Sequence, residues 1–262
     1  MTLRLTLLAA LVCAAYLPAI RAQYDDRESI DPAATQYTVD VPVVLPGGPA
    51  LAEPVALPPE DAVVLFDGSD LSAWVNVRGE DAHWTVADGV LTVDPGAIPY
   101  PPGGDIMTRD SFANFQLHLE FRTPAVVEGE GQGRGNSGIF LQGRYELQIL
   151  DSYDNPTYSN GQLGSIYKQS PPLANPARRP GEWQTYDVIY TAPVWSESGT
   201  LLHPAYVTAM LNGVLVQNHF PIWGPTEYKG LPVYPAPHGA APIKLQDHGN
   251  PTSFRNIWLR PL

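Results

Sequence analysis

The fold is decided by NSGIFLQGRYELQILD, residues 136–151. Apolar and polar residues alternate on both sides of a turn at Gly143-Arg144, and this period of two predicts two short β-strands. In the second strand, one face is apolar and the other carries Glu146 and Gln148. A carboxylate and an amide beside a glycine-bearing turn form either an ordinary solvated sheet face or a site for a hydroxyl-rich ligand.

Strand and turn signals continue through the rest of the chain. Residues 115–122 alternate strictly, Ala87-Asp88-Gly89 separates two short apolar runs, and Asn212-Gly213 is the strongest hairpin dipeptide. No stretch has a sustained helical period with caps. Roughly a dozen short strands of this kind predict an all-β, antiparallel two-sheet sandwich or barrel. Further strands are expected at residues 63–66, 183–190, 206–211, 214–216, 243–246 and 254–260.

The N-terminus has the layout of a secretory signal. Arg4 precedes an apolar run at residues 5–17, which is too short to span a bilayer comfortably, and Ala22 is the expected last residue before cleavage. The prediction is a signal peptide at residues 1–22 and a secreted or periplasmic protein. Cys13 suggests a lipoprotein anchor as an alternative, but Val12 is bulkier than such sites usually tolerate.

Residues 23–60 differ in composition from the rest. Seven prolines fall between residues 23 and 59, with little periodicity. This composition predicts an extended, partly polyproline-like linker, followed by one domain at residues 61–262.

Charge and cysteine content narrow the possible partners. The net charge is −12, and loss of the signal peptide removes two arginines and no acid, which gives −14. Such a balance argues against nucleic acid or an anionic membrane surface as partner, and it suits a neutral ligand with or without a bound cation. No other segment is long and apolar enough to cross a membrane, so no membrane insertion is expected. Cys13 is the only cysteine. The mature protein therefore cannot form disulfides and must rely on a hydrophobic core.

Three strands carry a polar row opposite their apolar row. If these rows stack across neighbouring strands, they form one broad groove. Periodicity alone favours the simpler interpretation, in which they are the wet face of a sheet. The rows are Glu120 and Arg122, Glu146 and Gln148, and Lys244 and Gln246.

The cluster Gln246-Asp247-His248-Gly249-Asn250 adds weight to the functional interpretation. It lies at a strand end, where loops carry functional side chains, and His248 titrates near neutral pH. The alternative is a turn formed by Asp247 and Asn250 around Gly249. No spacing matches a zinc signature or the nucleophile elbow of a serine hydrolase. The carboxylates of Glu120 and Glu146 form a candidate glycosidase pair.

An ordered set of motifs resembles the 3-keto-disaccharide hydrolase family over about residues 61–262. The motifs are Leu65-Phe66-Asp67-Gly68 with Leu71 and Trp74, Gly104-Asp105-Ile106, Asn136-Ser137-Gly138-Ile139-Phe140, Tyr145-Glu146-Leu147-Gln148-Ile149-Leu150-Asp151, Gly181-Glu182-Trp183, Leu211-Asn212-Gly213, Leu245-Gln246-Asp247-His248-Gly249 and Phe254-Arg255-Asn256-Ile257-Trp258. The resemblance implies a concanavalin A-like jelly roll with its ligand on the concave face, and action on glycosides oxidised at C3. The chain departs from the commoner pattern in a loop at 128–135 and a Pro-rich insert near 219–242.

The chemistry of such a substrate suggests roles for the polar residues. A C3 carbonyl acidifies the C2 proton, so a base can form an enolate, and the C1 oxygen then leaves before water adds back. We expect Glu146 or His248 to be the base, with Glu120 as a further catalytic candidate, and Arg122, Lys244 or a divalent cation to stabilise the enolate. The expected sugar-binding residues are Asn136, Gln148 and Gln246, together with Asp247 and Arg255. The expected ligands of a cation are Asp105, Glu146, Asp151 and His248.

Two other functions remain open at this point. A lectin-like module would bind carbohydrate without turnover, and an ordinary glycosidase would act on sugars without the keto group.

Overall fold

A computed structural model describes residues 30–95 and 104–262 of the chain. The predicted signal peptide at residues 1–22, including Cys13, lies outside the described residues. Within the described ranges, helical structure is limited to the short 3₁₀ turns η2 (Pro32–Thr35), η3 (Gly131–Gly133) and η4 (Ser159–Gly161). No helix in these ranges has the length and hydrophobicity needed to cross a membrane.

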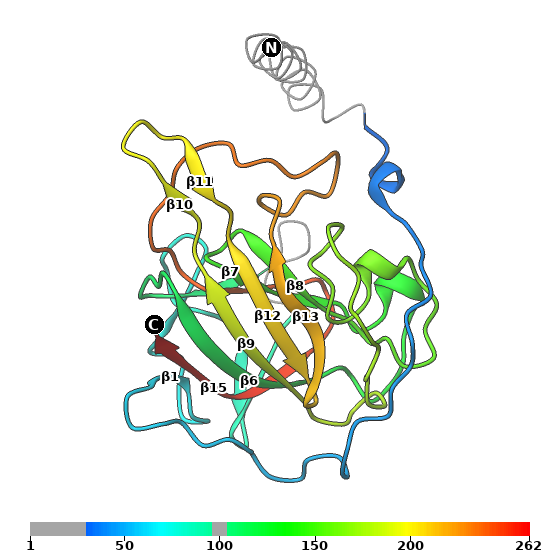
Figure 1. The fold of residues 1–262 in the computed structure, drawn as a ribbon. Helices are drawn as coiled ribbons and strands as arrows, with labels where there is room; N and C mark the ends of the chain where they lie inside the picture. Colours follow the sequence, from blue (N-terminus) through cyan, green and yellow to red (C-terminus); the bar gives the residue numbers. More distant parts are fainter. Residues whose placement is uncertain (1–29, 96–103) are drawn as a thin grey trace, which may run out of the picture.

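Two antiparallel sheets form a sandwich, which confirms the predicted fold (Figure 1). The larger sheet has eight strands in the order β13-β12-β9-β6-β15-β4-β3, with β1 also paired to β15. Its strands are β1 (Val63–Phe66), β3 (Thr85–Ala87), β4 (Val90–Thr92), β6 (Phe115–Arg122), β9 (Gln184–Thr191), β12 (Tyr206–Leu211), β13 (Val214–Pro221) and β15 (Ser253–Pro261).

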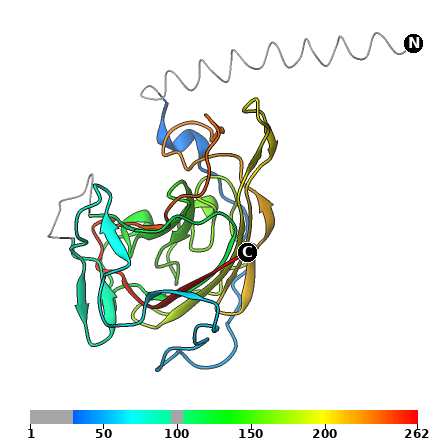
Figure 2. The same ribbon diagram turned by 90° about the vertical axis from the view of Figure 1, so that its left-hand side faces the viewer.

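The smaller sheet has five strands in the order β2-β5-β14-β7-β8. A separate hairpin of β10 (Val194–Trp195) and β11 (Leu201–His203) projects beyond the sandwich (Figures 1 and 2). The strands of the smaller sheet are β2 (Trp74–Asn76), β5 (Ile106–Thr108), β7 (Ser137–Leu141), β8 (Tyr145–Ile149) and β14 (Lys244–Leu245).

The alternating apolar rows of both sheets form one core. The apolar row of β6 is fully buried, as its period of two predicts, and so is the row of β8. Aromatic rings stack within this core, with 5.1 Å between the ring centroids of Phe121 and Tyr186 and 5.0 Å between those of Phe115 and Tyr190. Each fully buried side chain of this size contributes about 1.5–3 kcal/mol through burial. The described residues contain no cysteine, so this hydrophobic core, and not disulfide bonds, stabilises the domain.

Two buried tyrosines tie the larger sheet to the smaller one. The hydroxyl of Tyr186 donates to the backbone oxygen of Gln148 at 2.7 Å, and that of Tyr190 donates to Oε1 of Gln142 at 2.8 Å. A buried phenol needs such a partner. These bonds fix β8, which carries Glu146 and Gln148, against the core.

Hairpin turns follow the predicted chemistry with one shift. Asn212 and Gly213 both have positive φ, as a two-residue type I′ turn requires. In the stretch at 136–151 the predicted turn was Gly143-Arg144, but Leu141 pairs with Tyr145, and the positive φ values fall at Gln142 and Gly143. The turn thus begins one residue earlier than predicted.

The segment at residues 30–60 lies along the surface of the sandwich (Figure 1, blue). The backbone N–H of Val44 donates to the oxygen of Asn175, and the N–H of Asn175 donates to the oxygen of Pro42. Farther along, the indole of Trp258 donates to the oxygen of Ala56 at 2.8 Å. The residues predicted to be a linker therefore make regular contacts with the domain.

Candidate functional site

A cavity of about 520 Å³ lies on the smaller sheet. Strands β7 and β8 supply one part of its lining, the residues after β14 supply another, and loops at 167 and 226–228 complete it. Its size suits a small-molecule ligand. The lining residues are Asn136, Phe140, Glu146, Gln148, Tyr167, Thr226, Tyr228, Gln246 and His248.

Strand pairing explains why the lining residues meet. Phe140 lies opposite Glu146, and Gly138 lies opposite Gln148, in the antiparallel register of β7 and β8. The intervening residue Leu147 is fully buried in the core. The same alternation therefore places an apolar row inside the sandwich and a carboxyl and an amide in the cavity.

Glu146 is a buried residue of the cavity lining. Only 5% of its surface is exposed, and its backbone N–H donates to Oγ1 of Thr226 at 2.8 Å. A Cβ atom at Gly138 would lie 2.7 Å from Oε1 of Glu146, which is closer than real contacts allow. Glycine at 138 thus leaves the space that the carboxyl group occupies.

The charge state of Glu146 follows from its surroundings. Burial raises the pKa of this carboxyl to about 8, with Lys244 opposing the shift and Asp105 adding to it. Lys244 cannot compensate Glu146 fully, because its ammonium donates to Oδ2 of Asp105 at 2.6 Å. The ammonium also lies 3.9 Å from the ring centroid of Phe140. Glu146 is therefore largely protonated at neutral pH.

Three amide side chains line the same cavity as the carboxyl group. One end of the Gln148 amide lies 3.0 Å from Oε1 of Glu146. A nitrogen at that position donates to the carboxylate, whereas an oxygen there accepts from the protonated acid, so the amide suits both charge states. The amide nitrogen of Asn136 donates to the oxygen of Gln132 at 2.7 Å. Gln246 supplies a third amide, whose Oε1 is buried without a hydrogen-bond partner in the described structure.

His248 lies on the loop that follows β14. Burial lowers the pKa of its imidazole, while a backbone hydrogen bond and the charges of Asp105 and Asp247 oppose the shift. His248 is therefore neutral at pH 7 and able to accept a proton. The pKa of Glu146 is therefore higher than that of His248, whereas in free side chains the pKa of histidine is the higher one. Such an inverted order of pKa values is characteristic of acid–base sites.

Asp247 shapes this loop and does not line the cavity. It is fully buried, and its carboxylate accepts from the N–H of Gly249 at 2.8 Å and from the N–H of Gly104 at 2.9 Å. Its own N–H donates to Oδ1 of Asp105 at 2.9 Å. Asp247 was predicted to bind substrate; in the structure both of its carboxylate oxygens accept hydrogen bonds from the backbone, and it is not among the residues that line the cavity.

Glu120, Arg122 and Arg255 are not part of the cavity, which corrects the prediction of a single broad groove. They belong to β6 and β15 of the larger sheet, whereas the cavity lies on the smaller one. Glu120 is fully buried and accepts from Nε of Arg255 at 2.7 Å. Arg122 instead lies 4.6 Å from the ring centroid of Trp183.

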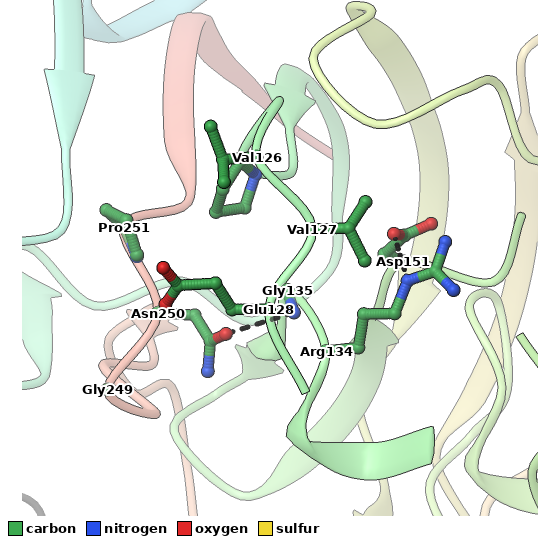
Figure 3. A pocket seen from close by; sticks show the side chains of 10 residues that line it. Val126, Val127, Glu128, Arg134, Gly135, Asp151, Gly249, Asn250 and Pro251 are labelled. Atoms are coloured by element: carbon green, nitrogen blue, oxygen red, sulfur yellow. Dashed lines mark hydrogen bonds and ion pairs between the residues drawn. The ribbon is translucent and has the colours of Figure 1, made fainter. Parts of the chain in front are cut away.

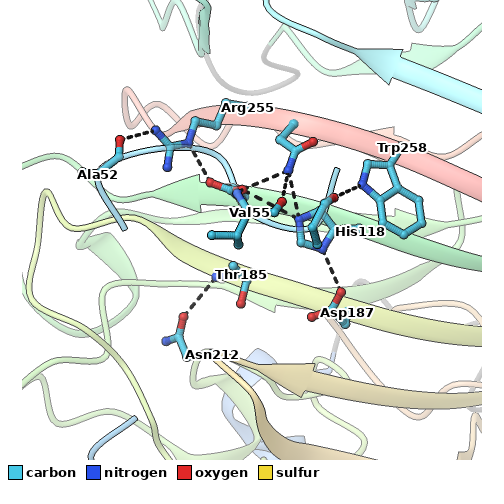
Figure 4. Close-up of polar contacts among 11 residues, drawn as sticks. Ala52, Val55, His118, Thr185, Asp187, Asn212, Arg255 and Trp258 are labelled. Carbon is cyan, nitrogen blue, oxygen red and sulfur yellow. Dashed lines mark hydrogen bonds and ion pairs between the residues drawn. The ribbon is translucent and has the colours of Figure 1, made fainter. Parts of the chain in front are cut away.

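Residues 52–55 cover Glu120 and Arg255, which form an outer cluster on the larger sheet. Val55 donates its N–H to Glu120 at 2.6 Å, and Arg255 donates to the oxygen of Ala52 at 3.0 Å (Figure 4). Burial raises the pKa of Glu120, but its hydrogen bonds, from His118 first, prevail and lower it overall. This carboxylate is ionised and fully paired, which leaves it no catalytic proton.

The predicted cation ligands do not assemble. Asp105 is paired with Lys244, and Asp151 is paired with Arg134 at 2.6 Å in a different, smaller cavity of about 140 Å³ (Figure 3). Across residues 30–95 and 104–262, no group of three or more His, Cys, Asp and Glu side chains is arranged to hold a metal ion. The set Asp105, Glu146, Asp151 and His248 does not fit a cation.

Four lining residues were absent from the sequence prediction. Tyr167 and Thr226 are two of them, and Tyr228 and Phe140 are the others. Phe140 falls at the alternating position shared with Gly138, so the strand pattern could have indicated it. Thr226 and Tyr228 lie in the Pro-rich insert near 219–242, where the chain departs from the commoner family pattern and no periodic signal marks individual side chains.

Tyr167 is a lining residue of the cavity that carries a hydroxyl group. Its hydroxyl lies 2.8 Å from that of Tyr158. Burial raises the pKa of Tyr167, and the neighbouring charge of Glu146 adds to the shift, so the phenol stays protonated. It can donate a hydrogen bond to a ligand oxygen while accepting one from Tyr158.

Comparison with known proteins identifies the family. Residues 61–260 match the model of the 3-keto-alpha-glucoside-1,2-lyase-like domain. The chain belongs to this family. The family resemblance predicted from the ordered motifs is thereby confirmed.

Two solved structures and one further protein illustrate what the chain is similar to. A Parabacteroides distasonis protein, provisionally named a glycosyl hydrolase, is 54% identical, with a TM-score of 0.76 over 86% of this chain and 94% of its own. A 3-keto-disaccharide hydrolase of Bacteroides thetaiotaomicron is 25% identical in sequence, in an alignment that covers 76% of this chain and 78% of the relative. A second P. distasonis structure is 21% identical, with a TM-score of 0.56 over 78% and 95% of the two chains, and shares the fold.

Proposed function

We propose that this protein is an exported enzyme that cleaves the glycosidic bond of 3-keto-glycosides by elimination and hydration. The observation that carries the proposal is the cavity in which Glu146 and His248 meet three amide side chains. Family membership supports the substrate class, and the name of the B. thetaiotaomicron relative supports it further. Fold alone would not, since sandwiches of this type serve many functions.

The first step is removal of the C2 proton. His248, neutral because burial lowers its pKa, takes this proton, and the C2–H electrons form an enolate with the C3 oxygen. The protonated hydroxyl of Tyr167 donates to that oxygen as charge develops on it. Lys244 adds positive charge near the cavity from its place against the ring of Phe140.

The second step expels the leaving group. The enolate electrons re-form the C3 carbonyl and a C1–C2 double bond, and the C1–O bond breaks. Glu146, which burial keeps largely protonated at neutral pH, gives its proton to the departing oxygen.

Addition of water then returns Glu146 and His248 to their starting protonation states. Water adds its oxygen to C1 and loses a proton to the Glu146 carboxylate, while the imidazolium of His248 returns a proton to C2. The sum is hydrolysis, and both side chains end in their starting states. Asn136, Gln148 and Gln246 bind the sugar hydroxyls through their amides.

The test uses two disaccharides that differ only at C3, one oxidised to the ketone and one not. The wild-type protein should release products from the keto form alone, and Glu146→Gln and His248→Ala should be strongly impaired. Turnover of the unoxidised disaccharide would indicate an ordinary glycosidase. Binding of either sugar without any product would indicate a lectin-like module. Full activity in both variants would refute the proposed site.

A further inference from the structure

We propose that Tyr228 is the platform of a second saccharide subsite, which receives the leaving unit of the substrate at the mouth of the cavity. The inference rests on the proposed function, since it concerns the part of the glycoside beyond the bond that is cleaved. Tyr228 lines the same cavity as Glu146, yet 62% of its surface is exposed, compared with 5% for Glu146. The cavity thus has a buried acid and, elsewhere in its lining, an exposed aromatic ring.

The surroundings of the ring leave room for a sugar. The ammonium of Lys168 lies 4.6 Å from the centroid of the Tyr228 ring, in a cation–π contact. The rest of the ring surface is largely uncovered, as its exposure requires. Sugar rings present a face of C–H groups that packs on an aromatic plane, while their hydroxyls remain available for hydrogen bonds. A saccharide unit is therefore the ligand class that this ring suits.

The loop that carries Tyr228 is fixed before any ligand binds. Lys168, which is only 4% exposed, donates through Nζ to the backbone oxygen of Tyr228 at 2.6 Å. The N–H of Thr226 donates to the oxygen of Arg144 at 2.8 Å, and its hydroxyl accepts from the N–H of Glu146. The position of the platform is thereby linked to that of the catalytic carboxyl.

Gln169 fixes the start of the same loop. Its amide nitrogen donates to the oxygen of Gly224 at 2.9 Å, and its amide oxygen accepts from the N–H of Trp223 at 2.7 Å. A loop held at several points along residues 223–228 loses little conformational freedom on binding. Such preorganisation is what a specificity-determining surface needs.

The segment before the matched domain holds the two residues that anchor the Tyr228 loop, Lys168 and Gln169. Nζ of Lys168 also donates to the oxygen of Pro32 at 2.6 Å, and the hydroxyl of Tyr37 donates to the oxygen of Gln169 at 3.2 Å. Pro32 and Tyr37 precede the family match, which begins at residue 61. Residues outside the matched domain therefore help to hold Lys168 and Gln169, which position the loop that carries Tyr228.

The experiment compares two 3-keto substrates that share the sugar being cleaved. One carries a second sugar as leaving group, and the other carries a methyl group. We expect Tyr228→Ala to lower kcat/KM for the disaccharide about tenfold relative to the methyl glycoside, mainly through KM. Tyr228→Phe keeps the ring and should retain nearly full selectivity. Trp223→Ala is the matched control, because Trp223 is an exposed aromatic residue of the same loop that does not line the cavity.

Failure of the subsite and failure of the proposed function give different results. Equal effects of Tyr228→Ala on both substrates, with the wild type active, would overturn the subsite alone. If the wild type turns over neither substrate, calorimetric binding of the same two compounds decides the question. Tighter binding of the disaccharide that depends on Tyr228 would support the subsite and reject the enzyme, whereas binding of neither compound would reject both.

Discussion

Two glutamates of this protein have the same sequence signature and opposite chemistry. Glu120 and Glu146 each occupy a polar position in a strictly alternating strand, and both are buried. Glu120 is paired with Arg255 and covered by the chain at Val55, so its pKa is lowered. Glu146 faces a cavity, with the nearby ammonium of Lys244 already bound to Asp105, so its pKa is raised. Compensation of charge, and not burial itself, separates the structural carboxylate of Glu120 from the proposed catalytic acid Glu146.

The largest expected effect is on turnover. Replacing Glu146 by Gln removes the transferable proton, and replacing His248 by Ala removes the base, so each should lower kcat by roughly 10²–10⁴-fold. Glu120→Gln, a matched change in the outer cluster, should keep kcat within a few-fold when assayed below its unfolding temperature. Steady-state kinetics on a 3-keto-disaccharide would break the comparison if Glu120→Gln were as inactive as Glu146→Gln.

The second effect is a loss of stability when the outer cluster of Glu120 and Arg255 is changed. Arg255→Ala leaves the buried Glu120 carboxylate without its cation and should reduce the free energy of unfolding by about 3–5 kcal/mol. Arg122→Ala, which loses a cation–π contact with Trp183, should cost no more than about 1 kcal/mol. Urea unfolding followed by tryptophan fluorescence measures both losses. Similar losses would mean that the outer cluster is not a tightly coupled pair.

The third effect is the pH dependence of stability. The folded protein holds the Glu146 proton up to a pKa of about 8, whereas the unfolded chain releases it near the ordinary value for glutamate. Wild-type stability contributed by this proton is thus complete at acid pH and is lost as the pH rises through about 8. At about 1.4 kcal/mol per pKa unit, the loss amounts to a few kcal/mol. Relative to wild type, Glu146→Gln should gain stability between pH 5 and pH 9 in chemical unfolding, and parallel profiles would contradict the assignment.

The smallest effect concerns the space around the carboxyl group of Glu146, the proposed catalytic acid. Gly138→Ala places a methyl group against Oε1 of Glu146 and should lower kcat/KM by roughly tenfold through misplacement of that group. Gly133→Ala is the control, because its added Cβ would meet nothing within 4 Å. Equal activity of the two variants would show that the carboxyl group can move aside without consequence.

The sequence predicted the sandwich because each strand carries its own pattern. The apolar row of β6 and the polar pair of β8 fall on the faces that a period of two requires. Glu146 and His248, about a hundred positions apart, both line the cavity, and both are candidates that the polar rows and the family motifs indicate. Strand alternation is a local pattern, and the other residues belong to the family motifs, so both could be predicted from the sequence alone.

The sequence could not assign the outer cluster correctly. The polar row of β6 resembles that of β8, and only the return of residues 52–56 across the larger sheet distinguishes them. That contact joins positions separated by 65 residues and has no periodic signal. Tyr228 was missed for a similar reason, because an irregular Pro-rich insert does not reveal which of its side chains reaches a cavity.

The most direct test is a pH titration of the two glutamates by ¹³C NMR of labelled side-chain carboxyls, assigned with the Glu146→Gln and Glu120→Gln variants. The account predicts a midpoint near 8 for Glu146 and one below the ordinary glutamate value for Glu120. A Glu146 midpoint between 4 and 5, in the ordinary range of roughly 4.2 ± 0.9 for folded proteins, would contradict its role as the acid of the site.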